Sequence, residues 1–336
     1  MVSYQMTSPS TLAVIIPAYN AEATLESCLV AIAASKRKPT EVIMFNDGST
    51  DTTVEIAERH GVKIVTNDKR AQGPAIGRNL ATQETDADIL VFIDADVDVH
   101  PNSIGLLEES ILTESDVAAA FGSYDDAPLS NRIAALYANL RHHFHHQTSA
   151  RDASTFWSGF GAIRRSDFVN INGFDAAYAE PSIEDIDLGT RLRNADRRIL
   201  LVPEAMAKHC KDWGLVQLWR TDVFNRALPW SRLIVSRVTD GADLNTSSRE
   251  KVIAITAHCI WLFGALSFFA PLISIAFFGA VMFFLAANRK FFILLARRGG
   301  SRLLIAGVIL HWLYYIYSSL AFAFIKLTHR IMVEAH

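Results

Sequence analysis

The segment ADILVFIDADVDVH, residues 87–100, carries the pattern on which the fold prediction rests. Five apolar residues, 89–93, lead directly into three acids spaced two apart, Asp94, Asp96 and Asp98. A short, continuous apolar run is typical of a strand that is buried on both faces of a parallel sheet. Because side chains alternate faces in an extended chain, we expect the three carboxylates on one side, where a divalent cation would relieve their repulsion.

The same pattern extends over residues 12–122, where short apolar runs are each followed by a helical stretch. The runs are LAVIIP (12–17), EVIMFND (41–47), VKIVT (62–66), ILVFID (89–94) and VAAAFG (117–122), with helices expected from about residues 22, 51, 74 and 101. This alternation predicts parallel βαβ units in a Rossmann-like, three-layer α/β sandwich. Ligands of such sheets bind beyond the carboxyl ends of the strands, so the polar residues 19–20, 46–47 and 94–96 should meet in one crevice.

The chain after residue 122 is less regular. Residues 129–147 predict a helix that ends in HHFHHQ, and FWSGFGAIRR (156–165) predicts a strand or loop that enters another helix. A further helix is expected from Ser182, where Ser182 and Asp185 fit the N-cap and N3 positions of a capping box. RRILLVP (197–203) predicts one more strand.

Two long stretches, 252–287 and 303–325, contain no Asp, Glu, Lys or Arg. About 20 apolar residues are needed to cross a bilayer, so the second stretch fits a single span. The first is too long for one crossing and is predicted as two short spans, about 252–269 and 271–287, bent near Ala270–Pro271. A long tilted or partly interfacial helix is the alternative. With 303–325, the sequence therefore predicts about three C-terminal transmembrane helices.

A half-apolar stretch with tryptophans and arginines, residues 214–235, precedes these spans. Such a helix is typical of one that lies at a membrane surface, with an ordinary amphipathic core helix as the alternative. The polar segment TDGADLNTSSRE (239–250) reads as a linker. The predicted domains are therefore a catalytic domain at 1–212, an interfacial helix and linker at 213–250, and a transmembrane region at 251–336.

Composition narrows the class of protein and its location. The net charge of −3 disfavours a nucleic-acid-binding protein. Cys28, Cys210 and Cys259 are far apart, which suits a reducing compartment without a disulfide framework. The N-terminus lacks the basic region of a signal peptide. Basic residues flank the predicted spans, which favours an integral protein of the cytoplasmic membrane with a cytosolic catalytic domain and the C-terminus outside.

Four motifs occur in a characteristic order: IIPAYNAE (15–22), FNDGSTD (45–51), GPAIGRN (73–79) and DAD (94–96). In this order and spacing the sequence resembles glycosyltransferase family 2, the inverting nucleotide-sugar enzymes with a GT-A fold. The resemblance continues through SGFGAIRR (158–165), NGFD (172–175) and IEDIDLGTRL (183–192) and covers roughly residues 10–210.

The resemblance implies a set of nucleotide-sugar-binding residues at the strand ends. They are Pro17, Tyr19, Asn20, Glu22, Asp47, Gly73, Arg78, Asp94 and Ala95. The arginine would lie near the diphosphate and Asp94 near the ribose or sugar. The usual pair of acids before Gly-Ser is Asn46–Asp47 here, so only the second acid of the motif is present.

The resemblance also implies a divalent cation, Mg²⁺ or Mn²⁺. Asp96 would be the ligand of the D-x-D motif, and Asp98 a third acid of the kind used by polyprenyl-phosphate transferases. His209 matches the late histidine of some GT-A enzymes, although a core or surface histidine is the alternative reading. A cation would absorb the negative charge that builds on the departing nucleoside diphosphate.

In the family, the E-D pair of IEDIDLG supplies the catalytic base, which implies Asp185 for that role and Glu184 as its neighbour facing acceptor or sugar. Taken alone, two carboxylates at a helix start could simply satisfy the helix dipole. A base favours a hydroxyl acceptor, since a polyprenyl phosphate is already an anionic nucleophile. The phosphate acceptor remains the alternative.

Other features leave alternatives open. His142 and His146 stand four apart on a helix, a spacing that suits a metal, an anion or a plain surface helix. Gln217 and Arg220 resemble the Q-x-x-R-W motif of processive synthases, yet Thr221 replaces the tryptophan, which favours single-sugar transfer. A nucleotidyltransferase would need a Gly-rich, lysine-bearing loop after the first strand, and none is there.

The sequence thus predicts a membrane-bound, metal-dependent, inverting glycosyltransferase of the hexosyltransferase type. It would move one sugar from a UDP- or GDP-type donor to a lipid or lipid-linked hydroxyl. An inactive nucleotide-sugar-binding scaffold is the alternative from another class, and the intact Asp94, Asp96 and Asp185 disfavour it. The sugar, the nucleobase and the oligomeric state have no signal in the sequence.

Overall fold

The computed structural model describes residues 10–66, 71–178, 180–236 and 247–334. The chain divides into two compact units, each described here by itself. The first unit comprises residues 1–123 and 150–207, and the second unit comprises residues 124–149 and 208–336. The domain boundaries expected at residues 212 and 250 stay a prediction.

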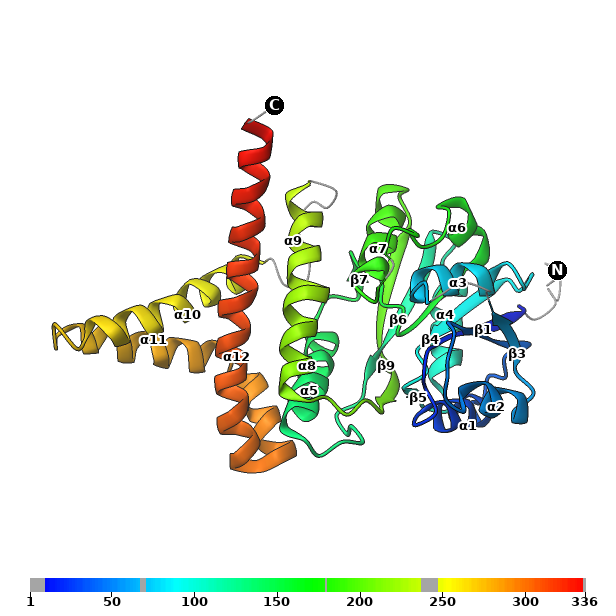
Figure 1. Cartoon of the computed structure of the whole chain (residues 1–336), viewed down its shortest axis with the longest axis horizontal. Helices are drawn as coiled ribbons and strands as arrows, with labels where there is room; N and C mark the ends of the chain where they lie inside the picture. Colours follow the sequence, from blue (N-terminus) through cyan, green and yellow to red (C-terminus); the bar gives the residue numbers. More distant parts are fainter. Residues whose placement is uncertain (1–9, 67–70, 179, 237–246, 335–336) are drawn as a thin grey trace, which may run out of the picture. The chain divides into compact units, whose positions relative to one another are not determined.

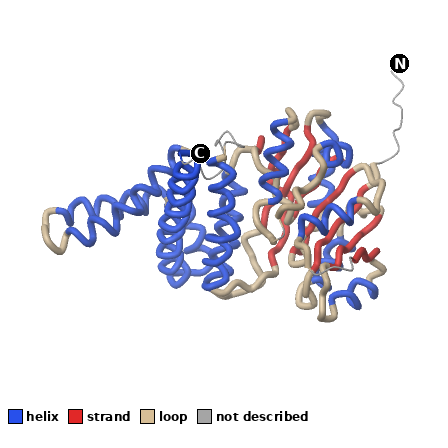
Figure 2. Tube along the Cα trace, turned by 45° about the horizontal axis from the view of Figure 1, so that its top comes forward, coloured by secondary structure: helices blue, strands red, loops and turns tan. Residues whose placement is uncertain are grey.

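A mixed sheet forms the centre of the first unit, with helices packed around it (Figures 1 and 2). Its strands are β1 (Leu12–Ala18), β2 (Glu41–Asn46), β3 (Lys63–Thr66), β4 (Ile89–Ile93), β5 (Val97–Val99), β6 (Val117–Tyr124), β7 (Asp152–Ala153), β8 (Phe160–Arg164) and β9 (Arg198–His209). Their order is β3-β2-β1-β4-β8-β6-β9-β5, and β7 pairs with β9.

The predicted parallel βαβ arrangement is confirmed for the first half of the sheet. β1 pairs in parallel with both β2 and β4, and β2 pairs in parallel with β3. β4 is buried at every position, as a strand covered on both faces must be. β8 runs antiparallel to β4 and to β6, so the whole sheet is mixed.

Helices connect these strands in the first unit. They are α1 (Leu25–Ala34), α2 (Thr53–Arg59), α3 (Pro74–Thr82), α4 (Ser103–Thr113), α6 (Arg165–Asn170) and α7 (Glu184–Asn194). The helices after β3 and β4 begin close to where the sequence predicts them, and Pro74 occupies the first turn of α3, where its missing N–H costs nothing. α1 and α2 begin two to three residues late, because residues 20–22 and 49–52 bond to each other first.

The expectation that three acids share one side of an extended chain is wrong. β4 ends at Ile93, and the Val97 N–H donates to the Asp94 carbonyl at 3.0 Å, which turns the chain. β5 then begins as a separate strand at one edge of the sheet, beside β9 and four places from β4 in the strand order. The turn breaks the side-chain alternation on which that expectation rested.

The predicted capping box at Ser182 and Asp185 is also absent. α7 begins at Glu184 with Ile183 as its N-cap, and no side chain caps it. The Ser182 N–H instead donates to Glu184 Oε2 at 2.9 Å. At this helix start it is therefore the Glu184 carboxylate that accepts a hydrogen bond from the Ser182 backbone, and the Ser182 side chain is not the cap.

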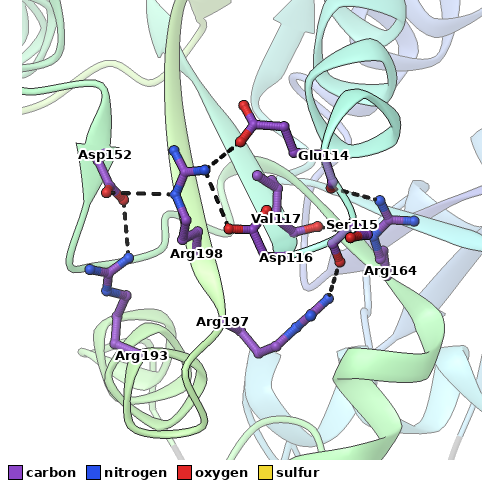
Figure 3. Close-up of polar contacts among 9 residues, drawn as sticks. All are labelled: Glu114, Ser115, Asp116, Val117, Asp152, Arg164, Arg193, Arg197 and Arg198. Carbon is purple, nitrogen blue, oxygen red and sulfur yellow. Dashed lines mark hydrogen bonds and ion pairs between the residues drawn. The ribbon is translucent and has the colours of Figure 1, made fainter.

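Arginine-rich polar contacts join several strands and helices of the first unit (Figure 3). The residues drawn are Glu114, Ser115, Asp116, Val117, Asp152, Arg164, Arg193, Arg197 and Arg198. Arg198 of β9 lies 2.5 Å from Glu114 and 3.4 Å from Asp116, and Arg193 lies 3.0 Å from Asp152 of β7. Each pair is partly exposed and contributes little by itself, but together they tie the residues before β6 to β9 and β7.

The second unit is helical among its described residues, apart from the last residues of β6 and β9. Its helices are α5 (Ile133–Thr148), α8 (Leu215–Arg220), the π-helix η1 (Thr221–Ala227), α9 (Leu228–Val235), α10 (Ser248–Leu266), α11 (Ile273–Ala287) and α12 (Arg289–Glu334). Non-helical backbone at Gly299 and Gly300 interrupts α12. Of the predicted linker, residues 239–246 lie outside the described residues.

Helices occupy each of the three predicted spans, and α10 and α11 are separated at the predicted bend around Pro271. Within the part of the chain that the structure describes, one helical stretch, Arg289–Arg330, is long and apolar enough to cross a membrane by length and composition. The predicted number of spans is not confirmed by this finding.

Gly122 provides a test of the sheet packing. A Cβ at this position of β6 would lie 2.2 Å from the Ala205 carbonyl oxygen and 2.7 Å from the Phe160 ring. Gly122→Ala is therefore expected to lower the free energy of unfolding by about 1–3 kcal/mol, read as a lower thermal midpoint of the full chain in detergent.

Gly105 is the matched control, because a Cβ there meets only Arg37 Cβ at 3.5 Å. Gly105 lies inside α4, so Gly105→Ala should leave stability unchanged or raise it by up to about 1 kcal/mol. Equal midpoints for the two variants would contradict the packing described for β6.

Candidate active site

The loops after β1 and β2 hold each other through asparagine side chains. Asn20 has a left-handed backbone (φ 48°), and its Oδ1 accepts the Thr50 N–H at 2.8 Å. Asn46, which stands where the motif more often has an acid, accepts the Ser49 N–H at 2.9 Å. Tyr19 beside them is 57% exposed. These side-chain contacts hold the two loops together, and the contact of Tyr19 with a base stays a prediction.

Glu22 and Pro17 position this edge of the sheet. Glu22 Oε2 accepts the Thr52 hydroxyl at 3.0 Å, and the Glu22 N–H donates to Asp51 Oδ2 at 3.1 Å. Pro17 is opposite Phe45 in the β1–β2 register. The nucleotide contacts predicted for Glu22 and Pro17 stay a prediction.

Asp47 anchors the entry to α3. Its two carboxylate oxygens accept the backbone N–H groups of Gln72 (2.8 Å) and Gly73 (2.9 Å). Gly73 has a φ of 87°, a conformation that glycine adopts without steric cost. The structure therefore gives Asp47 a positioning contact, and its contact with a nucleotide stays a prediction.

Arg78 joins three segments that are distant in the sequence. Its buried guanidinium donates from Nη2 to Asp94 Oδ1 at 2.7 Å and from Nη1 to Glu184 Oε1 at 3.0 Å. The same group lies 5.4 Å from the centre of the Phe174 ring. The sequence predicted Arg78 near a diphosphate; the structure brings it together with Asp94 and Glu184 at the end of β4 and the start of α7.

Asn79 is a site residue to which the sequence analysis gave no role. Its Nδ2 donates to the Phe174 carbonyl at 2.8 Å, and its Oδ1 accepts the Phe174 N–H at 2.9 Å. Gly173 lies so close that a Cβ there would be 2.6 Å from Asn79 Oδ1. The motifs R-N (78–79) and N-G-F-D (172–175) contain a signal for this contact, because Asn79 of the first motif bonds to Phe174 of the second.

Asp185 follows Glu184 in the first turn of α7. Its Oδ2 accepts the Ser158 N–H at 3.2 Å, and its Oδ1 accepts the Ile186 N–H at 2.8 Å. Withdrawal from water raises the pKa of Asp185, the neighbouring Glu184 raises it further, and Arg78 opposes them, which leaves a pKa of about 7. A carboxyl group with such a pKa exchanges protons at neutral pH, as a general base must.

The predicted cation ligands lie in different surroundings. Asp98 Oδ1 accepts the Ser27 hydroxyl of α1 at 2.9 Å; Asp96 and Asp98 are both partly exposed, and Ala95 is buried. Over residues 10–66, 71–178, 180–236 and 247–334, no group of three His, Cys, Asp or Glu side chains is placed to hold a metal. Mg²⁺ commonly takes only one or two carboxylates and completes its shell with substrate phosphates, so Asp96 fits the role in its chemistry.

His209, the third predicted ligand, belongs to the second unit. Its ring stacks on Tyr124 with centroids 4.4 Å apart, and His142 lies 5.0 Å from Tyr124 on the same unit. His142 and His146 are 4.3 Å apart. These rings form one aromatic cluster.

Two protein-family models match parts of this chain. A model of the N-terminal domain of galactosyltransferase matches residues 139–211. Residues 13–171 match glycosyl transferase family 2. This segment contains β1 to β4, Arg78 and Asp94, so the match and the geometry concern the same part of the chain. Together they support a glycosyltransferase of family 2.

Individual relatives carry glycosyltransferase names. The O-antigen chain rhamnosyltransferase RfbN of Salmonella typhimurium is 26% identical over 251 residues, which are 65% of this chain and 74% of that protein. The uncharacterized glycosyltransferase YibD of Escherichia coli is 32% identical over 119 residues, 34% of either chain. The matched segment spans about a third of the length of YibD and of an uncharacterized glycosyltransferase of Haemophilus influenzae.

A structure of GalNAc-T7 with UDP, GalNAc and Mn²⁺ has a TM-score of 0.51. It is 17% identical in sequence and covers 67% of this chain and 47% of its own. At that identity the likeness shows the fold alone, a GT-A-type glycosyltransferase fold.

Arg78→Met tests the central contact. It leaves the buried Glu184 without its counter-charge, and breaking a buried pair in this way costs about 3–5 kcal/mol. We expect a clearly lower unfolding midpoint at pH 7, and a smaller loss as the pH falls and protonation neutralises the carboxylates.

Arg59→Met is the matched control, because its partner Glu26 is half exposed and the pair is screened by water. It should change the midpoint little at any pH. If the two arginine variants lose stability equally, Arg78 does not carry the site.

Proposed function

We propose that this chain is a membrane-bound, inverting glycosyltransferase that moves one sugar from a UDP- or GDP-type nucleotide sugar to a hydroxyl group of a lipid or lipid-linked acceptor. The observation that carries the proposal is Asp185, a carboxyl group with a pKa of about 7 beside the Arg78 contact, in a chain whose N-terminal half matches family 2. In the proposal, residues 1–212 form the catalytic domain on the cytosolic side of the cytoplasmic membrane.

The donor would lie across the carboxyl ends of β1, β2 and β4. Tyr19, with Pro17 and Asn20 behind it, would contact the base, and Asp94 with Ala95 would contact the ribose or sugar. Loops braced by backbone contacts change little on binding, so less binding energy is lost in ordering them.

Asp185 would take the proton of the acceptor hydroxyl as its oxygen attacks the anomeric carbon. The bond from that carbon to the diphosphate oxygen breaks as the new one forms on the opposite face, and its electron pair leaves with the nucleoside diphosphate. The configuration at the anomeric carbon is therefore inverted. Arg78 positions Glu184, which would face the acceptor or the sugar, and helps keep Asp185 ionised above neutral pH.

A divalent cation, Mg²⁺ or Mn²⁺, fits the proposal with Asp96 as the protein ligand and Asp98 and His209 as further candidates. When bound, it would supply positive charge next to the departing diphosphate. The GalNAc-T7 structure of similar fold was solved with Mn²⁺ and UDP, which supports this part of the proposal.

The proposed hydroxyl acceptor has one specific alternative, a polyprenyl phosphate. A polyprenyl phosphate is already an anion and needs no base, whereas a carboxyl group held near a pKa of 7 is useful for a hydroxyl acceptor. The likeness to an O-antigen chain rhamnosyltransferase also supports a sugar-bearing acceptor. A phosphate acceptor would become the better reading if transfer survived the loss of Asp185.

Asp185→Asn should lower kcat for transfer to a hydroxyl by about 10²- to 10⁴-fold, the usual contribution of a general base. The donor affinity, measured by calorimetry, should change little. In the native protein kcat/KM should rise with pH through about 7 and then level off, because Asp185 must be ionised to accept the proton.

Glu184→Gln is the companion variant for the pH profile. It removes a negative charge that raises the pKa of Asp185, so the rising limb should move to lower pH. A limb that stays in place, or that persists in Asp185→Asn, would show that another group controls the profile.

Asp96→Asn tests the cation. With Mn²⁺ and a panel of UDP-, GDP- and dTDP-sugars, we expect slow donor hydrolysis that a chelator abolishes. Asp96→Asn should lower the rate of this hydrolysis by at least about 100-fold. Substitutions in the outer shell of a metal site cost about 10- to 100-fold, and the loss of a direct ligand should cost at least the upper value.

Asp98→Asn is the companion variant, because Asp98 is a further candidate ligand whose carboxylate accepts a hydrogen bond from Ser27. It should lose about 10-fold or less on the same scale. Full activity of Asp96→Asn would exclude Asp96 as the ligand.

A further inference from the structure

The hairpin formed by α10 and α11 is apolar on all sides. Between residues 252 and 287 it has no Asp, Glu, Lys or Arg, and its most exposed side chains are Phe268 (91%), Phe269 (87%) and Leu272 (83%) at the turn. Further exposed side chains along the two helices are Ile255, Trp261, Leu262, Leu266, Ile275, Phe278, Met282 and Phe283. A helix that is apolar all round is covered by protein or by lipid.

The charged residues of the hairpin lie together at its base. Residues 249–251 begin α10 and residues 289–290 follow α11. The Arg249 guanidinium donates to the Ala287 carbonyl, so the two ends lie side by side. A protein interface would carry polar groups around its rim, whereas this surface has charges at one end only, which is the distribution expected for insertion into lipid.

The base of the hairpin packs against the middle of α12. Trp312 Nε1 donates to the Ala257 carbonyl at 2.9 Å, and the Tyr315 hydroxyl donates to Glu250. Both contacts fall at the centre of the predicted span 303–325. In Figures 1 and 2 the hairpin leads away from α12 in a different direction from the α12 axis.

A buried ion pair lies at the same level of α12. Arg141 of α5 donates two hydrogen bonds to Asp222 of η1, at 2.8 and 2.7 Å, and the Tyr317 hydroxyl of α12 donates to the same carboxylate at 2.6 Å. The central part of α12 therefore contacts a carboxylate on each of two neighbouring elements.

These contacts conflict with a membrane-spanning α12. If residues 303–325 crossed the bilayer, Glu250, which is 14% exposed, and its ion-pair partner Arg249, which is 58% exposed, would lie at the level of its centre. Charged side chains there are costly unless they are enclosed. α12 shows an exposed apolar stripe with helical spacing, Ile305, Ile309, Leu313, Leu320, Phe324 and Leu327, and Ile293 and Phe322 are exposed outside it. Such a stripe fits a helix that lies along the membrane surface.

The arms of the hairpin are too short to carry its tip through a bilayer. Residues 252–266 and 273–287 each rise about 22 Å at 1.5 Å per residue, against a hydrocarbon thickness of about 30 Å. The turn between them, SFFAPL, contains no charged residue. An uncharged turn with exposed phenylalanines is stable inside hydrocarbon and not in water beyond it.

We infer that the second unit is anchored from one side of the membrane. The α10–α11 hairpin enters the acyl-chain region of a lipid bilayer and returns, α12 lies along the surface, and the C-terminal end of α12 stays on the side of the hairpin base. This arrangement replaces the predicted three spans and the external C-terminus. It rests on the membrane attachment in the proposed function but not on the sugar transfer, so either proposal can fail without the other.

The depth of two positions distinguishes the arrangements. A fluorescent label is attached to Phe269→Cys at the tip or to Leu313→Cys on the α12 stripe, both exposed, and the full chain is placed in phosphatidylcholine–phosphatidylglycerol vesicles. The parent chain, labelled in the same way, corrects for Cys28, Cys210 and Cys259. Lipids that carry a nitroxide near the head group or near the acyl-chain end report the depth by loss of fluorescence.

We expect the label at 269 to lose more fluorescence to the deep nitroxide and the label at 313 to the shallow one. Three spans predict the reverse. Deep quenching at both positions would show that α12 enters the bilayer, and shallow or absent quenching at 269 would show that water or a protein partner covers the tip. Each of these outcomes would overturn the inference.

The unsubstituted chain gives a second test. Epitope tags at the N-terminus and after His336 should be digested together when protease is added to one side of sealed vesicles. Protection of one tag and loss of the other would overturn the inference, while activity measured in the same vesicles reports on the proposed function separately.

Discussion

The rest of the candidate site depends on the buried guanidinium of Arg78. It is the one cation that the described contacts place among three carboxylates, those of Asp94, Glu184 and Asp185, two of which it binds directly. Glu184 is buried beside it, whereas the Asp94 side chain is 37% exposed. Withdrawal from water is the largest cause that raises the pKa of Asp185 to about 7, the neighbouring Glu184 raises it further, and Arg78 opposes both. The surroundings of Asp185, with Arg78 among them, therefore produce a base suited to neutral pH.

Around Arg78, several motif residues hold neighbouring backbone segments in place. Asp47 binds backbone N–H groups at the entry to α3, Asn20 binds the turn after β2, and Asn79 binds the backbone of Phe174. These contacts hold the segments after β1, β2 and β3, and the segment around Phe174 after α6, at fixed positions, which is what a site for a flexible nucleotide sugar requires. A motif residue can therefore be indispensable without touching the substrate.

The second unit reverses the usual distribution of polarity. Its interior contains the Arg141–Asp222 pair with Tyr317, whereas the α10–α11 hairpin and one face of α12 present apolar side chains outward. This distribution is stable when the surrounding medium is lipid. Exposing apolar side chains to lipid costs no free energy, and a charged side chain that is withdrawn from water is stable only when it is paired.

The sequence by itself determined the parallel strands β1 to β4, the start of α3 at Pro74, the family resemblance and the pair Glu184–Asp185, because each is written in local periodicity or a contiguous motif. Only the tertiary structure decided that the chain turns at Asp94, that Ile183 and not Ser182 is the N-cap of α7, and that Arg78 binds a glutamate 106 residues away. The same holds for the hairpin base against the centre of α12, where hydropathy alone indicated a span. Hydropathy and spacing report what one segment prefers, whereas these features depend on which distant segment supplies its partner.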